Sequence, residues 1–261
     1  MSATEWDARS YDRNSDMQLE SGREFLDEIE LRGDEVAVDA GCGSGRVTEL
    51  LAERVPRGRV TGVDASEAMI ESARTNLARF DSRVELVVSD LLEFAPSEPV
   101  DLVFSTSALH WIADHDRLFA RIHDWLRPGG RLAVLLGGGD NLREVLPAII
   151  AATRSDPFAD HFDGFEHPWK YPGIEEAVER LQRIGFTDVR CEPTELNYAF
   201  EDPREFHRTV YLVVHLEMLP PDLHEEFIDA VMEAEDDPTT GRFLHIKLTA
   251  RRPDNGAGRR T

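Results

Sequence analysis

One stretch near the start of the chain constrains the fold more than any other. Residues 36–50 read Val-Ala-Val-Asp-Ala-Gly-Cys-Gly-Ser-Gly-Arg-Val-Thr-Glu-Leu, an apolar strand that runs into a glycine-rich turn and then directly into a helix. Gly41 and Gly43 allow a tight turn and a close approach of the backbone to a ligand. Gly45 allows close packing of the new helix, whose first amide groups are free to bind. The stretch predicts a ligand site after the first strand.

The second strand ends in an acid that indicates the kind of ligand. Residues 59–64 read Arg-Val-Thr-Gly-Val-Asp, which places Asp64 19 residues after Gly45. A carboxylate at this position can accept hydrogen bonds from both hydroxyls of a ribose. The dinucleotide fingerprint G-x-G-x-x-G would need a glycine where Arg46 stands, so the spacing counts against a nicotinamide cofactor. We therefore expect a site for a different nucleoside-bearing cofactor.

Charge and hydropathy exclude several classes of function. The formal net charge of -22 argues against nucleic-acid binding, whose affinity comes mainly from Lys and Arg that neutralise phosphates. The sequence contains no run of about 18 apolar residues, the length needed to span a membrane. The amino terminus lacks the basic and apolar regions of a signal peptide. We therefore expect a cytoplasmic protein. Its few lysines and acidic surface suit a salt-rich cytoplasm, where screening reduces self-repulsion.

The two cysteines, Cys42 and Cys191, form neither a disulfide framework nor a metal site, so no metal is expected. Nothing in the sequence indicates an oligomeric state. A chain of 261 residues can bury one sizeable core, and one domain with insertions is the expected organisation.

Strand and helix patterns alternate along the first half of the chain. We expect strands at 35–39, 59–64, 83–88, 100–105 and 130–136, with helices at 45–54, 66–79 and 114–126. Apolar strands separated by amphipathic helices predict an α/β fold, with a parallel sheet covered on both faces. Ligands bind such sheets beyond the carboxyl ends of the strands. Four polar residues are expected at that edge, namely Asp39, Asp64, Asp90 and Ser105.

The remaining segments frame this core of residues 32–136. An amino-terminal arm, 1–31, contains one or two helices, and its residues 11–18 read as a loop or a flap over a site. Two insertions are expected, at about 137–172 and 195–240, the second with helices at 203–218 and 222–235. Between and after them we expect a helix at 174–184 and strands at 187–192 and 242–251, and residues 252–261 form a flexible tail. The aromatic residues of the first insertion could line a pocket or simply pack.

At the glycine-rich turn, the chain resembles the class I S-adenosylmethionine-dependent methyltransferases, whose first motif is an acid followed by G-x-G-x-G. The resemblance is strong over residues 35–136 and extends by topology to about 251. It implies a single domain with a Rossmann-like, doubly wound sheet of seven strands, mainly parallel, with an antiparallel strand near the carboxyl terminus. It also implies S-adenosylmethionine as cofactor. The implied cofactor contacts are Tyr11, Asp39, Gly41, Cys42, Gly43, Gly45, Asp64, Ala65, Met69, Asp90, Leu91 and Ser105.

Two further segments resemble branches of this family that methylate carboxylates. Residues 109–112 read Leu-His-Trp-Ile, similar to juvenile hormone acid O-methyltransferases and trans-aconitate methyltransferases, and the arm carries Tyr-x-x-x-Ser-x-x-Gln from Tyr11 to Gln18, similar to the first branch. The resemblance implies that Gln18 and Trp111 hold the substrate carboxylate. His110 could orient the substrate, serve as a base or be structural. The expected product is the methyl ester of a small, largely apolar acid.

Other functions stay open at this point. A metabolite could instead be methylated on nitrogen, carbon or a phenolic oxygen, with His110 or another group as base. A nicotinamide-dependent oxidoreductase or a non-catalytic cofactor-binding module could use the same sheet. The two insertions match no family signature, and acids such as Asp156, Asp160 and Asp163 suit an anionic substrate only if they face solvent.

Overall fold

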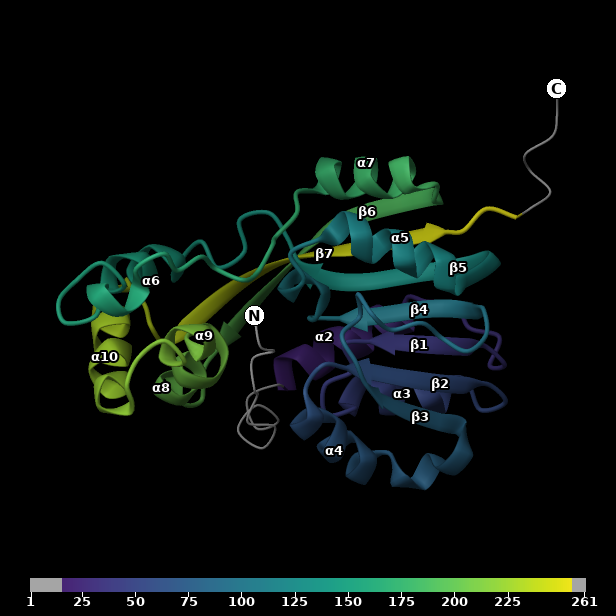
Figure 1. The fold of residues 1–261 in the computed structure, drawn as a ribbon, viewed down its shortest axis with the longest axis horizontal. Helices are drawn as coiled ribbons and strands as arrows, with labels where there is room; N and C mark the ends of the chain where they lie inside the picture. Colours follow the sequence, from purple (N-terminus) through teal and green to yellow (C-terminus); the bar gives the residue numbers. More distant parts are fainter. Residues whose placement is uncertain (1–15, 255–261) are drawn as a thin grey trace.

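A seven-stranded sheet organises the molecule in the computed structural model, which describes residues 16–254 (Figure 1). The strand order is β3-β2-β1-β4-β5-β7-β6. Strands β1 to β5 are parallel to one another, whereas β7 runs antiparallel to both β5 and β6. The expected mainly parallel sheet with an antiparallel strand near the carboxyl terminus is confirmed. The strands are β1 Val36–Ala40, β2 Arg59–Asp64, β3 Val84–Val88, β4 Val100–Thr106, β5 Leu126–Gly137, β6 Thr187–Ala199 and β7 Thr240–Arg251.

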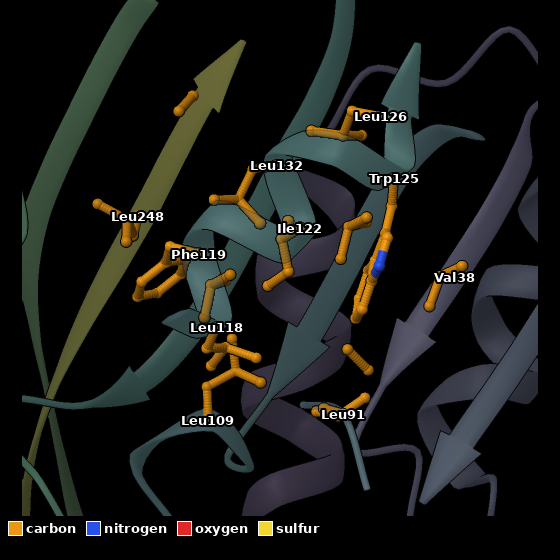
Figure 2. Packing of buried hydrophobic residues seen from close by; sticks show 14 of the residues in the cluster. Val38, Leu91, Leu109, Leu118, Phe119, Ile122, Trp125, Leu126, Leu132 and Leu248 are labelled. Atoms are coloured by element: carbon orange, nitrogen blue, oxygen red, sulfur yellow. The ribbon is translucent and has the colours of Figure 1, made fainter. Parts of the chain in front are cut away.

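Helices cover both faces of the sheet because successive strand residues point to opposite sides. Val38 of β1 packs on the side of α5 and α7, and Ala37 packs on the side of α2, α3 and α4. Figure 2 shows Leu118, Ile122 and Trp125 of α5 over the strands of the first face. The helices around the sheet are α2 Asp16–Asp27, α3 Arg46–Arg54, α4 Glu67–Asn76, α5 His115–Trp125 and α7 Ile174–Ile184, with the 3-10 turns η1 Ala78–Arg83 and η2 Leu109–Trp111.

The two insertions pack against each other around a second hydrophobic core, which includes Phe158, Phe206 and Phe227. The helices of the insertions gather beyond the carboxyl ends of the parallel strands (Figure 1). The start of β7 reaches them, because residues 240–244 pair with β6 alone, past the last residue of β5. The elements here are α6 Leu146–Ala152, η3 Ala159–Phe162, α8 Pro203–Phe206, the π-helical turn η4 His207–Tyr211, α9 Val213–Leu216, η5 Pro221–Leu223 and α10 His224–Ala234.

Several expected boundaries were wrong. Strand β6 continues to Ala199, so the second insertion begins near 200 instead of 195, because alternating apolar residues such as Leu196 and Tyr198 pack on the second core. Strand β5 begins at Leu126, with a register shift after Val100↔Leu126 that accommodates the Pro-Gly-Gly stretch expected to end the helix. The helix expected over 203–218 is broken by the non-helical backbone of Leu212, and α4 ends at Asn76.

The arm contains a helix, α2, as expected, and residues 16–18 of the expected loop or flap belong to it. Met17 and Gln18 belong to the first turn of α2, whose buried residues Met17, Ser21 and Phe25 recur at helical spacing. Tyr11 lies outside the described residues. Over residues 16–254, no helix is both long enough and apolar enough to cross a bilayer.

Candidate active site

A cavity lies at the carboxyl ends of β1, β2 and β4, where the sequence predicted a ligand site. It is called here the first cavity. Most of its wall comes from the glycine-rich turn and the segment after β4, and α2 closes one side. The lining residues are Gln18, Leu19, Asp39, Gly41, Cys42, Gly43, Ser44, Arg46, Val47, Asp64, Met69, Thr106, Ser107, Ala108 and Trp111.

The glycine-rich turn is shaped by close backbone contacts. A Cβ atom on Gly41 would lie 2.2 Å from the Cβ of Ala108, so a side chain there would displace the segment after β4. A Cβ on Gly43 would meet nothing within 4 Å, because this residue borders the open cavity. Gly45 faces α4 and the turn that follows it, where a Cβ would lie 2.7 Å from Cδ1 of Leu77. The expected close packing of α3 at Gly45 is confirmed.

Two carboxylates in the first cavity have different surroundings. Asp39 is 2 % exposed, and its Oδ2 accepts a hydrogen bond from the Thr48 hydroxyl at 2.6 Å. Burial raises the pKa of Asp39 to about 7, although the Thr48 hydrogen bond acts in the opposite direction. Asp64 accepts from the backbone N–H groups of Gly43 and Ser66, both at 2.9 Å. Asp64 is therefore held in a fixed orientation at the end of β2. A cationic partner would favour the ionised form of the buried Asp39.

A second cavity, of about 70 Å³, adjoins the first. Gln18, Ser107 and Trp111 line both, and these residues form the junction between the two cavities. Ser107 holds the chain in the left-handed region, with φ of 55°, and its N–H donates to the carbonyl of Leu135 at 2.8 Å. Trp111 packs edge-on against Trp169 of the first insertion, with ring centroids 5.5 Å apart. The junction thus joins the arm, the sheet edge and an insertion.

His110 lines the second cavity only. Its Nδ1 accepts from the Gly137 N–H at 3.4 Å, and its carbonyl accepts from the Lys170 N–H at 2.7 Å. Burial lowers the pKa of His110 to about 3, with smaller contributions from His245 and His115. The ring is therefore neutral at pH 7, with its proton on Nε2. A ring in this state is poorly suited to accept a proton, which favours an orienting or structural role over that of a base.

Other residues expected in the cofactor site do not line the first cavity. Asp90 is exposed, and its Oδ1 accepts from the Leu92 N–H at 2.7 Å. Leu91 packs in the hydrophobic core on the α5 side of the sheet. The Ser105 hydroxyl is buried and donates to the carbonyl of Ala40 at 2.6 Å. Ala65 is exposed beside Asp64, and Gly45 packs behind the turn.

The sequence reasoning did not name several residues that line the cavities. Ser107 directly follows the strand end at Thr106, so the rule that selected Ser105 would have found it with a better boundary. His245 lies opposite Gly137 on β7, near the start of an antiparallel strand. Antiparallel strands bring their first residues to this edge, and no rule about carboxyl ends could identify them. Over residues 16–254, no group of three or more His, Cys, Asp or Glu could hold a metal ion.

Comparison with known proteins agrees with this geometry. Residues 37–130, which include the glycine-rich turn and the ends of β2 and β4, match the methyltransferase domain family. The chain carries a methyltransferase domain. Its motifs and sheet order are those of class I, the S-adenosylmethionine-dependent group. The match favours this family over a nicotinamide-dependent one.

Relatives of this methyltransferase domain include two bacterial trans-aconitate 2-methyltransferases. The protein from Azoarcus sp. (strain BH72) is 40% identical over 129 residues, which are 49% of this chain and 49% of the relative. The protein from Rhizobium rhizogenes (strain K84) is 34% identical over 158 residues, 60% of this chain and 59% of the relative. The matches thus span about half the length of these relatives.

A solved structure extends the likeness in fold beyond the matched segment. Phosphoethanolamine N-methyltransferase 2 from Haemonchus contortus, solved with phosphomonomethylethanolamine and S-adenosylhomocysteine, superposes with a TM-score of 0.62. The superposition covers 95% of this chain and 57% of that one, at 20% identity. At this identity the comparison supports the fold alone.

Proposed function

We propose that this protein uses S-adenosylmethionine to methylate a carboxylate of a small organic acid, which yields a methyl ester and S-adenosylhomocysteine. The observation that carries the proposal is the junction between the two cavities. There, Gln18, Ser107 and Trp111 lie between the wall built from family motifs and a second wall without Lys, Arg, Asp or Glu. The names of the trans-aconitate relatives support a carboxylate as acceptor.

The first cavity suits S-adenosylmethionine in both charge and shape. Asp64 can accept from the ribose hydroxyls with its remaining lone pairs. Met69, which is buried on the wall, gives apolar contact to a purine. Asp39 offers a buried carboxylate to the ammonium group of the methionine part, and the open space beside Gly43 admits a ligand close to the backbone. Asp90 with Leu91, and Tyr11, are further proposed contacts on the adenine and arm sides.

A carboxylate acceptor needs no general base in this site. Carboxylates are ionised at pH 7, and His110 is neutral with its Nδ1 engaged. The bound cofactor supplies a sulfonium methyl group, and its transfer to a carboxylate oxygen leaves the C–S electron pair on sulfur without any proton transfer. The protein would contribute placement of the acceptor and exclusion of water, which together supply several kcal/mol in comparable reactions.

The test is ester formation by the whole chain, with wild type, Gln18→Ala and Trp111→Phe compared at saturating S-adenosylmethionine. Loss of a hydrogen bond to a charged acceptor should lower turnover about tenfold to a hundredfold, whereas the dissociation constant of S-adenosylhomocysteine should change less than about threefold. Gln182→Ala, an exposed glutamine on α7, is the matched control and should behave as wild type.

Three outcomes would contradict the proposal. Unchanged ester formation in both variants would remove Gln18 and Trp111 from the acceptor site. Methyl transfer only to amines, carbon acids or phenols, with a rate that follows a group titrating near pH 6–7, would replace the carboxylate with a nucleophile that needs a base. A thermal shift with NAD but none with S-adenosylhomocysteine would overturn the cofactor itself.

A further inference from the structure

The wall of the second cavity contains buried polar atoms that have no partner in the described part of the chain. Three such atoms are Gln18 Oε1, Ser107 Oγ and His245 Nδ1, and each belongs to a residue that lines this cavity. An unsatisfied buried polar atom costs about 1–3 kcal/mol, so folded proteins contain few of them. Three such unsatisfied atoms around one cavity indicate that it binds a polar ligand. Gln18 and Ser107 lie at the junction, but His245 lines the second cavity only.

His245 is placed by the antiparallel strand. It faces Gly137, the last residue of β5, in the β5–β7 register, and it is 7 % exposed. Burial lowers the pKa of His245 to about 4, so the imidazole is neutral at pH 7. A neutral imidazole has one N–H group and one bare nitrogen. His245 therefore presents an uncharged hydrogen-bonding group to the cavity.

Tyr171 provides a second uncharged group on the same wall. The Asn141 side chain acts on its hydroxyl and lowers its pKa, against the effect of burial. The Oδ1 atom of Asn141 already accepts from the Leu244 N–H at 2.9 Å. The Tyr171 hydroxyl can therefore donate its proton to a ligand. Burial raises the pKa of Tyr171 above its usual range, so this proton is retained at pH 7.

The charge of this wall limits what it can bind. None of its described residues is Lys, Arg, Asp or Glu, and its two histidines are neutral. The carboxylate to be methylated is assigned to the junction. If the acceptor carried additional carboxylates, they would be buried in this cavity without a cation, at a high desolvation cost. An uncharged oxygen would instead match the available N–H and O–H groups.

We propose that His245 and Tyr171 bind an uncharged oxygen of the acceptor, a hydroxyl or a carbonyl, so that the substrate is a hydroxy- or oxo-monocarboxylic acid. The inference rests on the proposed function, because the carboxylate to be methylated is assigned to the junction. It adds a second subsite, which selects among acids. The trans-aconitate named for the relatives carries three carboxylates and fits this subsite poorly.

The test uses the whole chain with S-adenosylmethionine and measures kcat/KM from S-adenosylhomocysteine release. The acceptors are butyrate, hexanoate and octanoate, each with its hydroxy and oxo counterparts, together with trans-aconitate. Wild type should prefer the hydroxy or the oxo acid over the parent acid by at least about tenfold, and trans-aconitate should be a poorer substrate than either. A preference for hydroxy over oxo acids, or the reverse, identifies which oxygen is bound.

Variants separate a binding role from a structural one. His245→Leu and Tyr171→Phe should reduce the preference to within about threefold, because kcat/KM should fall much further for the hydroxy and oxo acids than for the parent acid. His245→Asn places an amide near the position of Nδ1 and should restore much of the preference. An equal loss on both kinds of acid would make the two residues structural and overturn the proposal.

Failure of this inference is distinguishable from failure of the proposed function. The second subsite alone would be rejected if the enzyme esterified the parent acids as well as their hydroxy and oxo counterparts. Preferential use of trans-aconitate would reject it too. Absence of ester from every acid in the panel would reject the carboxylate function, and this inference with it.

Discussion

Asp39 is the residue whose chemistry most directly links the fold to cofactor binding. It is buried at the end of β1, and burial raises its pKa to about 7. If Asp39 pairs with the ammonium group of the cofactor, the bound state needs the ionised carboxylate. Binding should therefore be tightest above pH 7, and at pH 6 it should be about tenfold weaker because most of the free protein is protonated there. Calorimetric titration with S-adenosylhomocysteine from pH 5.5 to 8.5 measures this dependence.

Two variants assign the effect to Asp39. Asp39→Asn should bind weakly at all pH values and lose the dependence on pH. Thr48→Val removes the hydrogen bond that lowers the pKa of Asp39, so the midpoint of the binding curve should move to higher pH. A flat profile in wild-type protein would show that the cofactor does not need an ionised Asp39.

The sequence was sufficient to identify site residues that belong to one continuous motif or to the end of a neighbouring strand. Gly41 and Gly43 were identified because the strand, turn and helix around them are continuous, and Asp64 because it ends the neighbouring strand. Tyr171 and His245 are 74 residues apart in the sequence and line the same cavity only because an insertion packs beside an antiparallel strand. No local sequence pattern specifies this arrangement.

At the scale of elements, the alternation of apolar strands and amphipathic helices in the first half of the chain was sufficient to predict the parallel part of the sheet. The antiparallel strand was implied by the resemblance to methyltransferases. The insertions were harder, because their apolar residues pack on each other and on the ends of β6 and β7, away from the parallel strands. The extent of β6 depends on that second core, and so does the break at Leu212. The boundaries of the insertions therefore required the tertiary structure.

The second core contains a buried histidine whose replacement should stabilise the protein. His215 of α9 lies among the rings of Phe162, Phe165 and Trp169, and neither ring nitrogen has a partner among the described residues. Leucine is similar in size and carries no polar atom. His215→Leu should raise the free energy of unfolding at pH 7 by about 1–2 kcal/mol, as measured by urea denaturation.

The same variant should reduce acid sensitivity. Burial lowers the pKa of His215 to about 3, whereas an unfolded chain has the ordinary value near 6.5. The unfolded state therefore binds the proton first, and stability is lost as the pH falls from about 6.5 towards 3, by about 1.4 kcal/mol per pH unit. His161→Leu, at an exposed position, is the matched control. Lower stability of His215→Leu at both pH 7 and pH 5 would contradict the argument.

The whole molecule carries a large excess of negative charge. Asp and Glu number 51 against 29 Lys and Arg, which leaves a formal charge of -22. The ion pairs in the described part of the chain are mostly at the surface, and surface pairs each contribute about 0–1 kcal/mol. Salt weakens these short-range attractions and also the longer-range repulsion among the remaining acids. Because the Debye length falls from about 10 Å at 0.1 M to about 3 Å at 1 M, the longer-range term is screened more completely.

Repulsion should therefore dominate the salt response, and the melting temperature should rise between 0.1 and 1 M KCl. Two exposed acids that form no ion pair within residues 16–254, Asp163 and Glu166, provide the specific test. Asp163→Asn with Glu166→Gln should raise the melting temperature at low salt, and the gain should vanish at 1 M. Glu225→Gln removes one of the two carboxylate partners of Arg204 and of Arg208, and it should instead lower the melting temperature at low salt. A melting temperature that falls as KCl is added would mean that ion pairs outweigh repulsion, and would remove the basis for expecting a salt-rich cytoplasm.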